Sequence, residues 1–260
     1  MSSAFHESPV HLDLVEKLRS EGFVFLSSAA SRAVLVGSGR PQAAADPLPG
    51  WEAFSASWDD LGVDSHMADE GRYRRRRHGL LRVGGAGTHV PPERLPDAPH
   101  YQELEHNRLN GGKDRSFEPL KDATFRSGAF QIFVDYGRSL FSSLMSEARE
   151  WLVEAHQFRI EARVGAPGQP TPEGVHRDGV DFVLVALVRR VNIESGTTTI
   201  HDESGAQLGE FTLTEPLDMA LLDDRRVWHG VTAVDPMDET APAWRDVLVL
   251  TFRARPETAS

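Results

Sequence analysis

The sequence contains no cysteine among its 260 residues. This absence excludes disulfide bonds, iron–sulfur clusters and zinc sites built from thiolates, so any bound metal must be held by His, Asp or Glu side chains. The chain offers 11 histidines for such a role. The candidate metal ligands are therefore the histidines and the acidic residues near them.

Long hydrophobic runs and excess positive charge are also missing. No run reaches the roughly 18 apolar residues that a membrane-spanning helix needs, and the N-terminus lacks a basic and then apolar secretory pattern. The formal net charge is −11, whereas non-specific nucleic-acid binding depends on Lys and Arg neutralising phosphates. We therefore expect a cytoplasmic protein with a small-molecule partner and no membrane or nucleic-acid partner. An oligomer is compatible with the sequence.

The second half of the chain consists of short β-type segments separated by turn residues, a pattern typical of a sandwich or barrel. Eight such segments suit a double-sheet jelly roll. They are 152–164, 175–178, 182–191, 197–202, 208–213, 219–222, 229–234 and 247–253. Since 182–188 is apolar on both faces, we expect it to be a central strand.

The first half mixes helical and irregular patterns. Helices are predicted at 9–21 and 139–150, a short strand at 23–26, a surface loop at 38–50, and long irregular structure at 84–119 that we expect to line a site. The whole chain is thus predicted to be one mainly β (α+β) domain, residues 1–260. Residues 1–150 would cover a cupin-like jelly-roll core formed by residues 151–256.

Five arginines and one tyrosine stand between Arg72 and Arg77. If this run is a strand, Arg72, Arg74 and Arg76 share one face and can reach a site. Alternatively, the run is a solvated edge strand whose charges prevent it from pairing with other strands. Both interpretations remain open, while the acidic composition disfavours a nucleic-acid role.

The strongest candidate site is His176 and Asp178 together with the distant His229. Ligand-type side chains at i and i+2 of an extended segment point to the same side. Two imidazoles and one carboxylate on one face of an ion, with other positions open, are typical of non-haem Fe(II) oxygenases. The alternative is a set of buried, hydrogen-bonded polar residues.

Other histidines form weaker candidates. His201 and Glu203 also stand at i and i+2, but they lie at a predicted hairpin edge, where a solvated polar cluster is the simpler interpretation. His78, His89 and His100 are isolated in the sequence, and we expect them to be surface or packing histidines.

An iron site of this kind that uses a 2-oxo acid also needs a cation for the far carboxylate, and arginine grips a carboxylate with two parallel hydrogen bonds. Arg245, at the start of the last predicted strand, is the preferred candidate, and Arg253 on the same face is its competitor. We expect this strand to pair beside the strand that carries His229.

Several ordered blocks then suggest a family. They are Arg72–Arg77, Leu109–Gly112, His156–Ile160, His176–Gly179, Asp223–Thr232 and Arg245–Leu248. From about Gly71 onward, the sequence resembles the bacterial 2-oxoglutarate/Fe(II)-dependent dioxygenases that include L-isoleucine 4-hydroxylase. It departs from that pattern at Arg177, where glutamine is common, and in the block 194–198.

The resemblance implies a double-stranded β-helix that holds Fe(II) through His176, Asp178 and His229, with Arg245 on the 2-oxoglutarate carboxylate and O2 as oxidant. It also implies hydroxylation of a free L-amino acid with release of succinate and CO2. The candidates for substrate binding are Arg72, Arg74 and Arg76 for the carboxylate, Asp181 and Glu161 for the ammonium group, and Gln157.

Other functions remain as alternatives. A carboxylate at Asp178 occupies the position that a halide would need, which disfavours halogenation, but hydroxylation, desaturation and ring closure stay open. A non-catalytic jelly-roll binding or sensing protein is the second class of function. A zinc hydrolase with the same ligands is the third class. The sequence supports it less, because no candidate general base stands at a characteristic spacing from the ligands.

Overall fold

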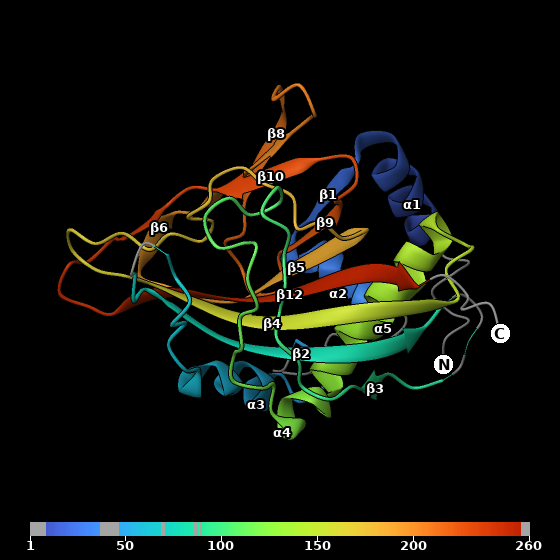
Figure 1. Ribbon diagram of the computed structural model, residues 1–260, viewed down its shortest axis with the longest axis horizontal. Helices are drawn as coiled ribbons and strands as arrows, with labels where there is room; N and C mark the ends of the chain where they lie inside the picture. Colours follow the sequence, from blue (N-terminus) through green and yellow to red (C-terminus); the bar gives the residue numbers. More distant parts are fainter. Residues whose placement is uncertain (1–8, 37–46, 69–70, 86–87, 89, 256–260) are drawn as a thin grey trace.

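The computed structural model describes residues 9–36, 47–68, 71–85, 88 and 90–255 (Figure 1). Its largest sheet has the strand order β1-β9-β5-β12-β4-β2-β3, and the pairs between neighbours are antiparallel. The strands are β1 (Phe23–Leu26), β9 (Met219–Asp223), β5 (Phe182–Val191), β12 (Ala243–Arg255), β4 (Glu150–Ala162), β2 (Arg74–Gly84) and β3 (Glu93–Arg94). As predicted, β5 is an interior strand.

A smaller sheet completes the jelly roll. It has the order β10-β7-β8, and a separate pair joins β11 to β6. The strands are β6 (Ile193–Ser195), β7 (Thr197–His201), β8 (Gln207–Thr212), β10 (Trp228–Val231) and β11 (Val234–Pro236). The mainly β, jelly-roll prediction is confirmed.

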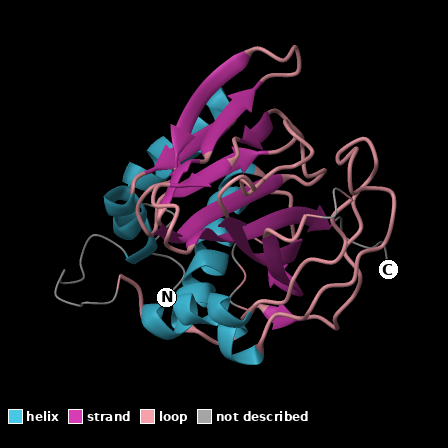
Figure 2. Ribbon diagram, turned by 90° about the vertical axis from the view of Figure 1, so that its left-hand side faces the viewer, coloured by secondary structure: helices cyan, strands magenta, loops and turns pink. Residues whose placement is uncertain are grey.

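The helices gather along one side of the strands (Figure 2). They are α1 (Pro9–Glu21), α2 (Ser28–Val36), α3 (Trp51–Ala56), the 3-10 helix η2 (Ser57–Asp60), α4 (Asp122–Phe125) and α5 (Gly128–Leu144). None of the helices in the described part of the chain is long and apolar enough to cross a membrane.

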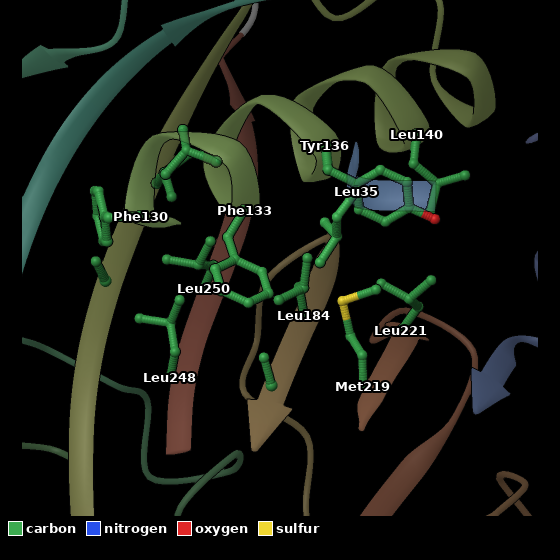
Figure 3. Packing of buried hydrophobic residues seen from close by; sticks show 14 of the residues in the cluster. Leu35, Phe130, Phe133, Tyr136, Leu140, Leu184, Met219, Leu221, Leu248 and Leu250 are labelled. Atoms are coloured by element: carbon green, nitrogen blue, oxygen red, sulfur yellow. The ribbon is translucent and has the colours of Figure 1, made fainter. Parts of the chain in front are cut away.

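Helix α5 forms the main contact between the helices and the large sheet. The Ser127 hydroxyl accepts a hydrogen bond from the Phe130 amide and so caps the first turn. Phe130 and Phe133 belong to one buried cluster with Leu248 and Leu250 of β12, and Phe133 lies beside Leu250 (Figure 3). This packing fills the helix side of the sheet and leaves its other face to form a cavity.

Strand β12 shows how the alternation divides the two faces. Leu248 and Leu250 belong to the core under the helices, whereas Arg245, Val247 and Val249 line the cavity. Because side chains on a strand alternate, one run of sequence supplies both the core and the site wall.

Several predicted boundaries need correction. The helix predicted at 139–150 is α5, which begins at Gly128 and ends at Leu144, because Ser127 caps it and β4 begins at Glu150. The segment 175–178 makes a single bridge at His176 instead of a strand, and the predicted strand 229–234 is divided between β10 and β11. The predicted loop at 38–50 falls largely outside the described residues.

Candidate active site

His176 and His229 lie opposite each other on neighbouring backbone segments. The amide of each donates to the carbonyl of the other at 2.9 Å, which places their ring centroids 4.5 Å apart. His176 Nδ1 also lies 3.0 Å from the Gly174 carbonyl oxygen. Donation from Nδ1–H to that carbonyl leaves His176 Nε2 free to ligate a metal.

Asp178 completes the cluster with spacing that suits a shared ion. Its Oδ1 lies 3.6 Å from His176 Nε2, and its Oδ2 lies 3.8 Å from His229 Nε2. Both distances exceed an ordinary hydrogen bond. Ligand atoms about 2.1 Å from one ion lie about 3 to 3.5 Å apart, so a small closure of the three side chains would complete a facial site.

The electrostatics of the cluster also favour a cation. Burial works against a charge on His176, but the Asp178 carboxylate outweighs it and raises the pKa of His176 to about 9. Burial and the charge of His176 lower the pKa of His229 to about 4. The pKa of Asp178 is lowered by both histidines although burial opposes this. The carboxylate therefore attracts positive charge, and a divalent ion competes with the proton for these atoms.

Asp224 fixes the turn that carries Asp178. Its carboxylate accepts hydrogen bonds from the amides of Asp178 at 3.0 Å, Gly179 at 2.8 Å and Val180 at 3.1 Å. Gly179 has φ +77°, and a Cβ there would lie 2.4 Å from the His106 ring, so only glycine fits. Asp224 is 1% exposed. It was not among the predicted site residues.

Arg245 lies in the same cavity as the three candidate ligands. It is 3% exposed, its Nε has no hydrogen-bond partner, and it forms no ion pair with a described carboxylate. Burial, with a contribution from Arg190, lowers the pKa of Arg245 to about 10. A buried guanidinium without an anion is costly, so the site fits the far carboxylate of 2-oxoglutarate.

Arg253 is placed differently from Arg245. It is exposed and donates to the Gly179 carbonyl at 2.9 Å, so it already has a partner. The predicted pairing of this strand with the His229 strand is wrong, because β12 pairs with β4 and β5 and β10 belongs to the smaller sheet. The two sheets instead bring Arg245 and His229 to one cavity.

A second cluster of histidines surrounds Glu154. Its Oε2 lies 2.8 Å from His78 Nε2 and 2.7 Å from His100 Nδ1, and His156 Nδ1 lies 2.8 Å from Arg76 Nη2. These distances are those of hydrogen bonds. The positive charge of Arg76 next to His156 disfavours binding of a divalent cation there. The cluster is a hydrogen-bonded network, in contrast to the longer spacing around Asp178.

This network corrects the interpretation of two histidines. His78 and His100 were expected to be surface or packing residues, but both hydrogen-bond to Glu154, and His100 lines the cavity. His89 lies outside the described residues. The β2–β4 register places His78 opposite His156, and this proximity cannot be read from their separation in sequence.

The predicted substrate residues divide into two groups. Arg74 and Arg76 are buried and line the cavity, which decides between the two interpretations of the arginine run. The other four do not line the cavity. Gln157 donates to Ser57 Oγ and Glu161 pairs with Arg75, both on the opposite face of β4. Arg72 is exposed before β2, and Asp181 accepts from the Ala254 amide. Arg177 stacks on Trp228, with Cζ 4.9 Å from the ring centroid.

The irregular segment supplies cavity residues that the sequence interpretation did not name. Gln102 Nε2 lies 3.4 Å from both the carbonyl oxygen and Oδ1 of Asp178. Asn107 and Arg115 line the cavity, as does Glu173 from the loop before His176. Residues of the segment 84–119 thus line the cavity, but nothing in their sequence pattern singled out these side chains.

A jelly roll that gathers two imidazoles and a carboxylate beside an unpaired arginine defines the class of non-haem iron oxygenases. Comparison with known proteins gives the particular family. The family model for 2OG-Fe dioxygenases matches residues 55–251, so the chain belongs to that family. Its members are enzymes that use Fe(II), 2-oxoglutarate and O2.

Individual relatives agree with this assignment. The chain is 35% identical to a bsmA homologue from Methylobium petroleophilum, with a TM-score of 0.82 over 100% of this chain and 99% of that one. It is 26% identical over 156 residues to an L-isoleucine-4-hydroxylase from Bacillus thuringiensis, an alignment that covers 59% of this chain and 64% of that relative. A solved structure of IDO from the same organism shares the fold, with 18% identity, coverage of 94% and 99%, and a TM-score of 0.75.

Proposed function

We propose that this enzyme hydroxylates a free L-amino acid at an unactivated C–H bond, with release of succinate and CO2. The observation that carries the proposal is the juxtaposition, in one cavity, of the open His176–Asp178–His229 cluster and the unpaired Arg245. Relatives named for isoleucine and hydroxy-isoleucine support the substrate class.

The residues fit the cofactors as follows. His176, Asp178 and His229 would hold Fe(II), because their ligand atoms all lie within 4.8 Å of one another. Arg245 would bind the far carboxylate of 2-oxoglutarate. Bound Fe(II), together with 2-oxoglutarate and O2, supplies the oxidising power for attack on the C–H bond.

The protein orients and shelters this chemistry. Val183 and Val185 of β5 and Val247 and Val249 of β12 line the same cavity as Arg245. An apolar wall excludes water and strengthens the interaction between the buried guanidinium and a carboxylate. Asp224 holds the Asp178 turn through three backbone amides.

The test is a panel of the proteinogenic L-amino acids, incubated with the protein, Fe(II), 2-oxoglutarate and O2. The expected result is succinate formed in equal amount to a product heavier by one oxygen atom. A product lighter by two hydrogens would instead identify desaturation or ring closure. If no amino acid stimulates succinate formation above background, the proposal fails and a binding or sensing role gains support.

A further inference from the structure

Two buried arginines share one aromatic ring at the β2 side of the cavity. The Cζ of Arg76 lies 3.5 Å from the centroid of Phe117, and the Cζ of Arg115 lies 5.9 Å from it. Arg76 is 4% exposed and Arg115 is 2% exposed. Both line the cavity that holds the candidate metal ligands.

Neither arginine has a carboxylate of its own among the described residues. Asp64 is bound by Arg74 at 2.7 Å, and the nearest approach of Arg76 to that carboxylate is 3.8 Å. Arg115 donates to the neutral amide oxygen of Gln102 at 3.3 Å. The Nε atoms of Arg76 and Arg115 are buried and have no hydrogen-bond partner in the part of the chain that the structure describes. Such guanidinium groups are stabilised when a ligand brings a negative charge.

A ligand bound there would lie next to the candidate metal site. Gln102 accepts from Arg115 and also donates to Asp178, so one side chain joins the arginine pair to a candidate metal ligand. In the sheet, β4 separates β2 from β12, and two strand spacings amount to about 10 Å. The Arg76–Arg115 pair therefore lies apart from Arg245 in the cavity.

Glu173 supplies the opposite charge nearby. It lines the same cavity, and its side chain is 9% exposed. Oε1 accepts from Asn107 Nδ2 at 3.4 Å and lies 3.5 Å from His176 Nε2, whereas Oε2 is buried without a hydrogen-bond partner among the described residues. An ammonium group is a donor that this oxygen can accept from.

We propose that Arg76 and Arg115 bind the α-carboxylate of the substrate and that Glu173 accepts from its α-ammonium group, while Arg245 is reserved for 2-oxoglutarate. This assignment rests on the proposed function and deepens it. It makes the substrate a free α-amino acid held at both charged groups, with its side chain directed to the metal.

The experiment compares Arg115→Gln with Arg245→Gln, and uses Arg75→Gln as a matched control on the opposite face of β2. For any amino acid that stimulates succinate formation, Arg115→Gln should raise its KM about 10- to 100-fold and leave the KM for 2-oxoglutarate unchanged. Arg245→Gln should raise the KM for 2-oxoglutarate and leave the KM for the amino acid unchanged. The control should match the wild type, and circular dichroism checks that each variant is folded.

Binding provides a readout that does not depend on turnover. Each amino acid is titrated calorimetrically, without O2, into protein loaded with Mn(II) and 2-oxoglutarate. The α-amide and the deaminated acid of the best ligand should both bind more weakly, and Arg115→Gln should weaken the amino acid more than its amide. Arg76→Lys should likewise weaken binding of the amino acid more than binding of its amide. It serves as the second test if Arg115→Gln does not fold.

The outcomes separate the two proposals. Arg115-dependent amino-acid binding without succinate formation supports the binding assignment and refutes the proposed hydroxylation. Turnover of an amino acid with an unchanged KM in folded Arg115→Gln, or equal affinity for its amide, overturns the assignment alone. Absence of any amino-acid binding also overturns it.

Discussion

Replacing Asp224 with asparagine tests whether the geometry of the metal site depends on a residue outside it. The two carboxylate oxygens accept from three backbone amides, at Asp178, Gly179 and Val180. An asparagine has one acceptor oxygen, so its NH2 group must face at least one of these donors. The turn therefore loses at least one hydrogen bond to a charged acceptor, which is worth about 1.5–3 kcal/mol.

This loss should appear in metal affinity more than in global stability. Burial and the nearby Asp178 carboxylate raise the pKa of Asp224 to about 7. The negative charge of Asp224 therefore destabilises the folded state, and an uncharged asparagine removes this destabilisation. The two effects oppose each other in the free energy of unfolding. Metal binding, however, needs Asp178 in place, and loss of such a supporting contact lowers metal affinity about 10- to 100-fold.

The assay is a competition titration of Fe(II) or Mn(II) against a chelator at pH 8, because alkaline pH favours the ionised form of the Asp224 carboxyl. Asp202→Asn is the matched control, because Asp202 also accepts from backbone amides, at Ser204 and Ala206, in an exposed hairpin turn. Wild-type metal affinity in Asp224→Asn would refute the reasoning, as would an equal loss in the control.

Three further predictions follow from the cavity. His229→Ala should leave a folded protein that retains no stoichiometric metal after dialysis and forms no succinate; full metal occupancy by elemental analysis would contradict the ligand assignment. Arg245→Gln should raise the KM for 2-oxoglutarate about 10- to 100-fold, measured by succinate formation, with metal affinity unchanged; an unaffected KM would shift the role to Arg253. The pKa of Glu154 is held below its ordinary 4.5 by the two histidines that donate to it although burial opposes this, so its stabilising contribution is present above pH 4.5 and is lost as pH falls further. In urea unfolding below pH 4.5, the free energy of unfolding should therefore fall less steeply with pH in Glu154→Gln than in the wild type. The same pH dependence in both proteins would argue against the network.

The candidate metal ligands could be indicated by residue type, and the structure brings His176, Asp178 and His229 together. The i, i+2 spacing of His176 and Asp178 predicted strand alternation, but residues 175–178 form a single bridge at His176, and His229 comes from a distant segment. Alternation did apply to the last strand, where Arg245, Val247 and Val249 share one face and line the cavity. The neighbours of β12 were not predictable in the same way, since strand order depends on how the two sheets form.

The residues on the other side of the cavity depend on contacts between distant segments. His78 and His156 meet through the β2–β4 register, and Gln102 reaches Asp178 from a segment without regular structure. Asp224 acts through backbone amides 44 to 46 residues away. No periodicity marks such residues, so the sequence could indicate the segment but not the side chains.

The arginine run shows how charge balance distinguishes a binding face from a structural face. On the outer face of β2, Arg75 pairs with Glu161, and Arg77 pairs with Glu118 and lies 3.8 Å from Asp60, so each arginine has at least one carboxylate of its own. On the cavity face, Arg74 and Arg76 share one carboxylate among the described residues, that of Asp64. A surface arginine without a partner is solvated at little cost, but a buried one is not. The unbalanced face is the one expected to receive an anionic group from a ligand, and alternation along a single strand separates it from the balanced one.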